Sequence, residues 1–345
     1  MKTKILLLFY CFSINCVYSQ SSEGVKKVMF YNVENLFHPS KDSVKSDGDF
    51  TPTGLYHWTY KKYYRKVSMT SKVIIAAGEG EPPWIVGLAE IENEQVVKDL
   101  CYRTPLKRYN YGYVHYESPD RRGVDVALLY RKDSVNILNH RKIPVVFPFE
   151  PSTKNRDILQ VTVELVEGDT LDIFVNHWTS RYGGYAATVP KRNHYASTLR
   201  NVIDSIIGKN EKAKILVMGD FNDYADNESL RKILGAEEYN GEENGMLYNL
   251  VLGIRGKKVS GTHKHEDFWG CLDQIIVTKG LIFSEKGVVI SGGAVIFEED
   301  FLLEADEKYG GWKNHRTYSG PRYIGGFSDH LPIYIRLEER KKVEN

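Results

Sequence analysis

The chain has 345 residues, of which 46 are basic (Lys and Arg) and 45 are acidic, so its formal net charge is +1. This length suits one large globular domain or two ordinary ones, and a hydrophobic content of 42% without repeats excludes fibrous and disordered proteins. The near-neutral charge excludes a protein that attracts nucleic acid through its overall charge, so any polyanion binding requires a local patch.

The first residues have the pattern of an export signal. Lys2 and Lys4 precede an apolar run at 5–12, and residues 17–19 have the small-x-small character of a cleavage site. We therefore expect residues 1–19 to be a signal peptide and the mature protein to begin at residue 20. The expected location is the periplasm, the cell surface or the medium.

Two other interpretations of this segment are weaker. A transmembrane anchor would need a longer apolar run than one interrupted by Ser13 and Asn15. A lipid anchor on Cys16 is disfavoured because Asn15 is a poor residue before such a cysteine. Later stretches are too short and polar to cross a bilayer, so we expect an exported protein without a membrane span.

Export leaves Cys101 and Cys271 in the mature chain. Burial as a small hydrophobic side chain is the favoured role for Cys271, which begins a predicted strand. A disulfide between the two is the alternative, because an oxidising compartment permits one.

Hydrophobic periodicity predicts many strands and a few helices. The predicted strands cover residues 25–32, 84–89, 124–131, 158–165, 171–176, 215–223, 272–277, 288–290 and 331–337. The predicted helices cover 60–77, 94–101 and 191–207, and the predicted loops cover 38–57, 235–270 and 306–326. On the first helix, the core candidates are Tyr64, Val67, Val73 and Ile74.

Acids, amides and histidines follow the ends of several predicted strands. In the clearest case, the apolar run 215–218 is followed by Gly219, Asp220, Phe221 and Asn222. Because strand side chains alternate between faces, Asp220 and Asn222 should leave on the same side, with Phe221 in the core. The alternative is a strand closed by an Asx turn, in which Asp and Asn only cap backbone groups.

These side chains suggest a type of chemistry. Carboxylates and amides suit Mg²⁺, Mn²⁺ or Ca²⁺, and the chain lacks a cysteine–histidine spacing typical of zinc. It also lacks a P-loop and a Gly-x-Ser-x-Gly nucleophile elbow. The combination favours metal-assisted hydrolysis of a phosphate ester.

A series of short motifs then resembles a known family. In chain order, they are YNVEN at 31–35, GLAE at 87–90, VNH at 175–177, GDFN at 219–222, LDQ at 272–274 and SDH at 328–330. The series resembles the metal-dependent endonuclease/exonuclease/phosphatase family, whose archetype is deoxyribonuclease I. The resemblance implies a single domain at 20–345. Its fold would be an α/β four-layer sandwich, with two mixed β-sheets packed face to face and helices on the outside.

The resemblance also implies roles for individual residues. Glu90, Asn32 and Asp329 match the metal-binding region, and Mg²⁺ is the expected ion, with Mn²⁺ or Ca²⁺ as alternatives. Glu34 and Glu92 are expected to orient neighbours or to face solvent.

The remaining matches concern catalysis and substrate binding. Asp220 matches the residue that orients or deprotonates the attacking water, and Asn222 matches the amide that holds that water or a phosphate oxygen. His177 and His330 match histidines that donate to the phosphate, with Asp273 orienting His330. We expect neighbouring carboxylates to keep these histidines protonated. The residues expected to bind substrate are Arg156, a loose match to a phosphate-binding arginine, and Arg181.

The sequence leaves several classes of substrate as alternatives. The segment from His177 to Arg181 resembles exported bacterial nuclease-like members, so a phosphodiesterase acting on nucleic acid, as a monomer, is expected first. A phosphatase or phosphodiesterase acting on a small or lipid-linked phosphate is the alternative, which the near-neutral charge favours. A non-catalytic binding protein of the same fold is disfavoured because the motif residues are intact. Aromatic residues at 308–324 could stack on bases or sugars, or only pack.

Overall fold

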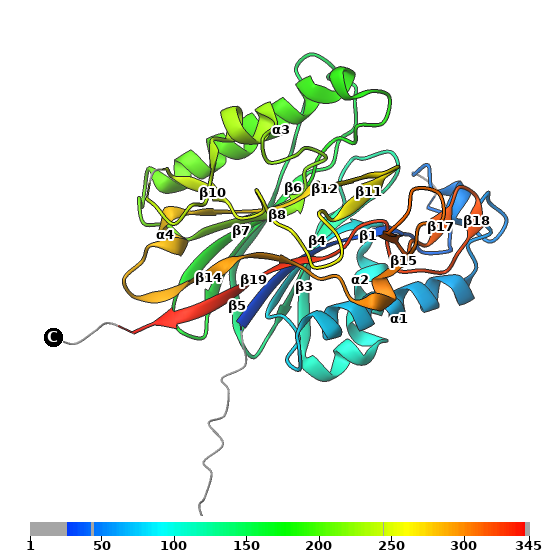
Figure 1. Cartoon of the computed structure of the whole chain (residues 1–345), viewed down its shortest axis with the longest axis horizontal. Helices are drawn as coiled ribbons and strands as arrows, with labels where there is room; N and C mark the ends of the chain where they lie inside the picture. The colour runs from blue at the N-terminus through cyan, green and yellow to red at the C-terminus, as the bar shows by residue number, and fades with distance from the viewer. Residues whose placement is uncertain (1–25, 43–44, 244, 342–345) are drawn as a thin grey trace, which may run out of the picture.

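The computed structural model describes residues 26–42, 45–243 and 245–341 (Figure 1). The predicted signal peptide at 1–19 lies outside the described residues. A six-stranded sheet has the order β14-β19-β1-β2-β4-β3, and a seven-stranded sheet has the order β5-β6-β7-β8-β13-β10-β9. Both sheets contain parallel and antiparallel pairs, which confirms the expected mixed sheets.

The strands of the first sheet are β1 (Lys26–Leu36), β2 (Ile85–Ile91), β3 (Tyr111–His115), β4 (Asp125–Arg131), β14 (Gly287–Ile296) and β19 (Ile333–Arg340). Those of the second sheet are β5 (Val135–Ile143), β6 (Ile158–Leu165), β7 (Thr170–His177), β8 (Ile215–Asp220), β9 (Ala236–Glu238), β10 (Leu247–Asn249) and β13 (Asp273–Thr278). Short pairs form from β11 (His263–His265) and β12 (Phe268–Gly270), β15 (Leu303–Ala305) and β16 (Trp312–Asn314), and β17 (Tyr318–Ser319) and β18 (Arg322–Tyr323).

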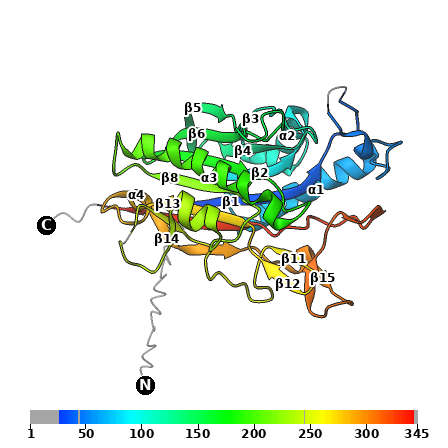
Figure 2. The same cartoon turned by 90° about the horizontal axis from the view of Figure 1, so that it is seen from above.

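The helices are α1 (Tyr60–Ala77), α2 (Glu94–Tyr102), α3 (Tyr185–Ile207) and α4 (Lys279–Ile282), with shorter helical turns at Gly48–Phe50, Pro105–Tyr109, Ser229–Leu234 and Asp300–Leu302. Figure 1 shows α3 on one side of the sheets and α1 with α2 on the other. Figure 2 shows β11, β12 and β15 grouped on one side of the molecule. Within the described parts of the chain, we find no helix with the length and hydrophobicity to cross a membrane.

Two layers of apolar packing explain this arrangement. Strands β1, β2 and β4 of the first sheet contact β7 and β8 of the second, so the two sheets bury one shared core. The outer face of the second sheet packs on α3 through Phe174, Val217, Leu199 and Ile203, which are all fully buried. Each face of a sheet must bury its apolar side chains against another layer, and helices supply the outer layers here. The expected α/β sandwich is therefore confirmed.

Local signals set the ends of the first two helices. The Thr59 side chain accepts a hydrogen bond from Lys62 N at the start of α1, and Asn93 accepts one from Val96 N at the start of α2. The bounds of α1 match the predicted helix at 60–77. The prediction that Tyr64 lies in the core is wrong, because this residue is 40% exposed and Tyr63 is buried in its place.

Three other interpretations of the sequence also need correction. Helix α3 begins at Tyr185 rather than at 191, and Pro190 lies inside it, beyond the first turn, so the helix continues across a residue that cannot donate a backbone hydrogen bond. The predicted loop at 235–270 contains β9 to β12, which are too short to show an alternating pattern. Cys101 and Cys271 are both free thiols, so the disulfide alternative is not the arrangement found.

Candidate active site

Strand pairing brings the motif residues of the second sheet into one row. In register, His177 at the end of β7 lies opposite Asp220 at the end of β8, and Asp220 lies opposite Asp273 at the start of β13. In the first sheet, Asn32 pairs with Ala89, the residue before Glu90. The strand ends therefore present the acids and amides at the same edge of the two sheets, as the sequence predicted.

Asp220 is the centre of this group. Asn32 Nδ2 donates a hydrogen bond of 3.0 Å to Asp220 Oδ2, which joins the two sheets. Nε2 of His177 and Nε2 of His330 each lie 3.8 Å from the same oxygen. The other oxygen, Oδ1, accepts from Asn222 N at 2.9 Å. One carboxylate oxygen thus closes an Asx turn while the other faces the site. Asp220 therefore has both of the roles that the sequence offered as alternatives.

Burial controls the ionisation of Asp220. It raises the pKa of Asp220 to about 7, with the His330 charge opposing this rise and the Asp273 charge adding to it. A carboxylate whose pKa lies near neutrality is well suited to accept a proton from water.

His330 forms a close pair with Asp273. Its Nδ1 lies 2.8 Å from Asp273 Oδ2, which also accepts from the Thr262 hydroxyl. Ser328 Oγ accepts from His330 N and donates to Asn32 O. Burial alone would lower the pKa of His330, but the charges of Asp273 and other carboxylates raise it well above its usual value. The raised pKa favours the expected imidazolium at this position.

His177 behaves differently from His330. Burial, followed by the positive charges of Arg156, Arg122 and His330, lowers the pKa of His177 well below its usual value. The expectation that carboxylates keep both histidines protonated is thus wrong for His177. Its Nε2 lies 3.8 Å from Asp220 and 3.9 Å from Glu90, beyond hydrogen-bond distance, whereas His330 has the direct 2.8 Å contact with Asp273. A neutral imidazole still carries one N–H for donation.

Backbone strain is concentrated at these strand ends. Glu34, Asn35, Glu90 and Asn222 all have positive φ, between 49° and 64°. The left-handed region is unfavourable for residues with a side chain, and such strain persists where the surrounding structure enforces it, often at functional sites. The pairing of β2 with β1 and β4 shifts register at the same place. The sequence did not reveal these distortions, although they aim Glu90 into the site.

Glu90 and Asn32 fit a hard divalent cation. Glu90 Oε2 accepts from Asn35 N at 2.7 Å, while Oε1 lies 3.9 Å from both Arg122 Nη2 and His177 Nε2, beyond hydrogen-bond distance. Asn32 Oδ1 accepts from Glu34 N at 3.0 Å and keeps a second lone pair. Carboxylate and amide oxygens of this kind are ligands for Mg²⁺.

Asp329 has a second partner. Its Oδ2 accepts from Arg316 Nη2 at 2.9 Å, so a cation bound by Asp329 would share that carboxylate with an arginine. Glu34 is also paired, accepting from Thr317 N at 2.7 Å. Glu92 accepts from His38 N. Glu34 and Glu92 thus orient neighbours, as expected.

The two predicted substrate-binding arginines support loops of the site. Arg156 is buried, and it donates to the carbonyls of His177 at 2.8 Å and Trp178 at 2.6 Å. Arg181 donates to the Asn222 carbonyl at 2.7 Å and pairs with Asp223 at 3.2 Å.

The amide of Asn222 also makes a structural contact. Its Nδ2 donates to the Trp178 carbonyl at 3.1 Å rather than to a neighbouring side chain of the site.

Two arginines that the sequence analysis did not select reach the site. Arg122 Nη2 donates to Asn35 Oδ1 at 2.9 Å and lies near Glu90, and Arg316 lies between Asp329 and Glu34. Arg122 lies just before the predicted strand at 124–131, and this position was the sequence signal that could have placed it in the site. Arg316 lies in a predicted loop without such a signal.

Comparison with known proteins identifies the family. The family model described as "Endonuclease/Exonuclease/phosphatase family" matches residues 27–339. The chain belongs to the endonuclease/exonuclease/phosphatase family. It is therefore an enzyme of the phosphoesterase class, in a family that depends on divalent metals. None of the curated proteins matches the chain in sequence.

Solved structures share the fold of this family. The human Nocturnin catalytic domain with bound sulfate is 16% identical, with a TM-score of 0.54 over 92% of this chain and 95% of that one. The Bacteroides thetaiotaomicron mannosyl-6-phosphatase is 16% identical, with a TM-score of 0.56 over 91% and 99%. D. rerio TDP2 complexed with a single-strand DNA product is 16% identical, with a TM-score of 0.54 over 92% and 100%.

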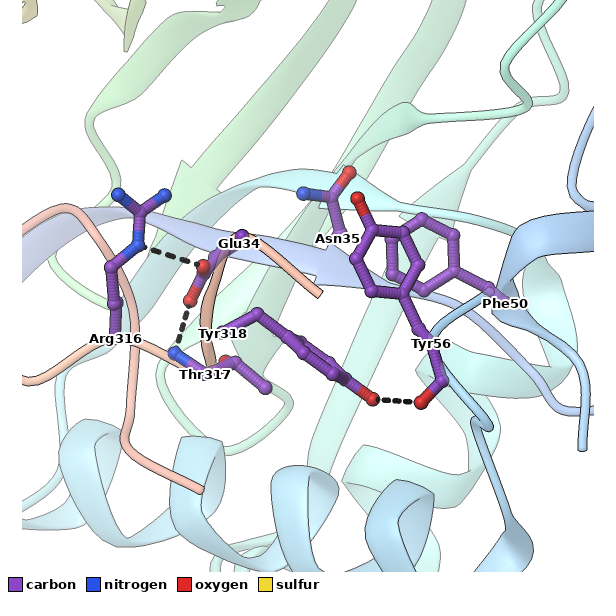
Figure 3. A pocket seen from close by; sticks show the side chains of 8 residues that line it. Glu34, Asn35, Phe50, Tyr56, Arg316, Thr317 and Tyr318 are labelled. Atoms are coloured by element: carbon purple, nitrogen blue, oxygen red, sulfur yellow. Dashed lines mark hydrogen bonds and ion pairs between the residues drawn. The ribbon is translucent and has the colours of Figure 1, made fainter. Parts of the chain in front are cut away.

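Two hollows lie near the family's motif residues: Glu34 and Asn35 line the first, and Arg156, which donates to the His177 carbonyl, lines the second. The first, of about 190 Å³, is shown in Figure 3. Glu34 and Arg316 form its charged side, and Phe50, Tyr56 and Tyr318 form its aromatic side. The rings of Phe50 and Tyr56 stack at 4.6 Å, and the Tyr318 hydroxyl donates to the Tyr56 carbonyl at 2.8 Å, so the aromatic side is well ordered.

The second hollow, of about 550 Å³, is rich in basic side chains. Its cationic lining residues are Arg122, Lys154, Arg156 and Lys191. Arg122 links the two hollows, since it lines the second and donates to Asn35, which lines the first. The near-neutral chain thus has a local basic patch beside its reactive groups.

Proposed function

We propose that this protein hydrolyses phosphodiesters, with nucleic acid as the substrate class, in a reaction that requires Mg²⁺ or a similar hard cation. The observation that carries this proposal is the pair of hollows that the hydrogen bond from Arg122 to Asn35 connects. A phosphodiester has a group on each side of its phosphate, whereas a monoester has only one. The aromatic hollow suits a base or sugar, and the basic hollow suits a neighbouring phosphate.

The cation would be held by Glu90 and Asn32, with Asp329 beside them. When bound, it would offset the negative charge of the phosphate and stabilise the leaving oxygen. The strained backbone at Glu90 supports this assignment, because it holds one carboxylate oxygen free of close hydrogen bonds.

Side chains of the protein would accept the proton of the attacking water and donate hydrogen bonds to the phosphate. Asp220 would accept a proton from the attacking water through Oδ2, the oxygen that faces both histidines. The His330 imidazolium, oriented by Asp273, would donate from Nε2 to a phosphate oxygen where negative charge develops. Neutral His177 would offer a weaker donor on the other side of Asp220.

An alternative substrate is a small phosphate, such as a sugar phosphate. The modest volume of the aromatic hollow, about 190 Å³, favours this alternative. It is supported by the shared fold with a protein named mannosyl-6-phosphatase, although fold alone does not carry substrate identity.

A substrate panel tests the proposal. Purified protein would be assayed with Mg²⁺ on bis(p-nitrophenyl) phosphate and p-nitrophenyl phosphate, then on DNA, RNA, phospholipid and sugar phosphates. We expect the diester to be cleaved faster than the monoester, and a nucleic acid to be the best natural polymer. Cleavage of monoesters alone would overturn the phosphodiester assignment in favour of the alternative.

We also propose export and a monomeric state. Support for export comes from Lys2, Lys4 and the apolar run at 5–12. N-terminal sequencing of the native protein should give a start at Gln20, and an intact Met1 would refute export. Light scattering of the mature protein should give the mass of one chain.

A further inference from the structure

A second histidine–carboxylate cluster lies at the base of the loop 116–124. His115 is the last residue of β3, Asp125 is the first residue of β4, and Glu117 lies in the loop between them. Each residue offers one ligand atom, and these atoms all lie within 4.8 Å of one another. None of the three belongs to the active site described above.

Two buried atoms in this cluster lack a partner. The side chains of His115 and Asp125 are only 2% and 1% exposed, and their Nε2 and Oδ2 atoms are 3.9 Å apart, too far for a hydrogen bond. Among the described residues, neither atom has a hydrogen-bond partner. Buried polar atoms are nearly always paired, so two unpaired atoms facing each other indicate a missing ligand.

From this geometry, we propose that His115, Glu117 and Asp125 bind a divalent transition-metal ion, with Zn²⁺ as the best match. One imidazole nitrogen and two carboxylates are typical zinc ligands, whereas Mg²⁺ prefers oxygen ligands alone. Tetrahedral ligands at zinc bond lengths lie roughly 3.4 Å apart, so a small contraction of the cluster is sufficient.

The surroundings prepare these ligands for a cation. Asp125 Oδ1 accepts from Ser118 N at 3.0 Å and from the Ser118 hydroxyl, which leaves Oδ2 facing His115. The Glu117 side chain is 52% exposed, and Lys45 Nζ lies 3.8 Å from its carboxylate. Glu117 can therefore leave this lysine and close over the ion.

The ion would fix a loop that serves the active site. The same loop carries Asp120, which lies 3.8 Å from Arg156, and Arg122, which reaches Asn35 and Glu90. A metal that joins the end of β3 to the start of β4 would hold both ends of this loop. Its role would be structural, at a distance from the reacting phosphate.

Zinc retention tests the proposal. The full mature chain would be stripped with a chelator, incubated with Zn²⁺, passed through gel filtration and analysed for metal content. We expect one tightly held zinc in the wild type and its loss in His115→Ala. Glu117→Gln should bind zinc at least about tenfold more weakly, the scale for disturbing a metal site. His265→Ala is the matched control, because His265 is exposed and outside the cluster, and it should retain the ion.

The alternatives give different outcomes. Glu90→Gln should retain the zinc, and its loss there instead of in His115→Ala would place the ion in the active site and overturn the proposal. If His115→Ala fails to fold, Glu117→Gln decides, and unchanged affinity in that variant contradicts the site. A wild type that retains no zinc would overturn the proposal.

Discussion

Two buried histidines in this protein lie next to aspartates, yet they differ in charge. Nδ1 of His330 is 2.8 Å from Asp273, and further carboxylates lie nearby, so its pKa rises well above the usual value. Nε2 of His115 is 3.9 Å from Asp125, and burial lowers its pKa to about 4. A buried histidine is charged only where close carboxylates offset the cost of burial.

The difference separates two kinds of site. The pair at His330 is joined by a close contact between Nδ1 and Asp273 Oδ2 and carries a raised histidine pKa, which suits binding to a phosphate. The pair at His115 is not closed by a hydrogen bond, and it leaves a ring nitrogen and a carboxyl oxygen facing each other without partners among the described residues, which suits a cation. His177 is also neutral, so the active site itself combines one charged and one neutral histidine.

The largest effect should come from removing the carboxylate that both active-site histidines face. Asp220→Asn should reduce kcat for diester hydrolysis by about 10²–10⁴-fold, the usual contribution of a general acid or base. The folded-state pKa of Asp220, about 7, lies above the usual value, so ionisation opposes folding. The variant should therefore keep or raise Tm, and a large fall in Tm would show that the lost activity reflects misfolding.

The next effect concerns the charged pair. His330→Ala should cost roughly 10²–10³-fold in kcat, the scale for losing a preorganised donor. Because the two residues act as a unit, His330→Ala with Asp273→Asn should be little worse than His330→Ala alone. Steady-state rates of the two single variants and the double variant test this, and fully additive losses would show that Asp273 acts independently.

A pH profile sharpens the same comparison. His330 has a raised pKa, so its imidazolium is present at low pH and is lost as pH rises through that pKa. Asp273→Asn removes a charge that favours the imidazolium, so the basic limb of kcat/KM against pH should move to lower pH. If the basic limb lies at the same pH in the wild type and in Asp273→Asn, His330 is not the group whose titration produces it.

The smallest expected effect is on the free energy of unfolding of the metal-free protein. In chelator, His115→Leu should change the free energy of unfolding by less than about 1 kcal/mol, because it removes a nitrogen that has no partner. His330→Leu should cost about 1–3 kcal/mol, because it deprives buried Asp273 of a hydrogen bond. Urea unfolding of both variants measures the difference, and equal costs would contradict the contrast between the clusters.

Much of the site could be predicted because its residues follow strand ends. His177, Asp220 and Asp273 each end or begin a strand, Asn32 lies where the regular pairing of β1 with β2 is interrupted, and pairing carries such residues to one edge. The edge strand β5 was missed because most of its residues are exposed, so it lacks an apolar alternation.

Other features depend on contacts that a sequence does not reveal. Arg156 and Arg181 have the charge expected of substrate-binding residues, yet their guanidinium groups hold backbone carbonyls. The charge on His177 depends on the distance to its neighbours, which spacing along the chain cannot give. The cluster at His115 was missed for a related reason, since its ligands meet only when β3 and β4 pair.

The central claim is that Glu90 holds a divalent cation required for phosphodiester hydrolysis. The most direct test is the rate of bis(p-nitrophenyl) phosphate cleavage against Mg²⁺ concentration, in wild type and in Glu90→Gln, starting from chelator-treated protein. We predict no turnover in excess chelator, recovery with Mg²⁺ in the wild type, and a requirement for much higher Mg²⁺ in the variant. Undiminished turnover in excess chelator, or identical Mg²⁺ curves for the two proteins, would contradict the account.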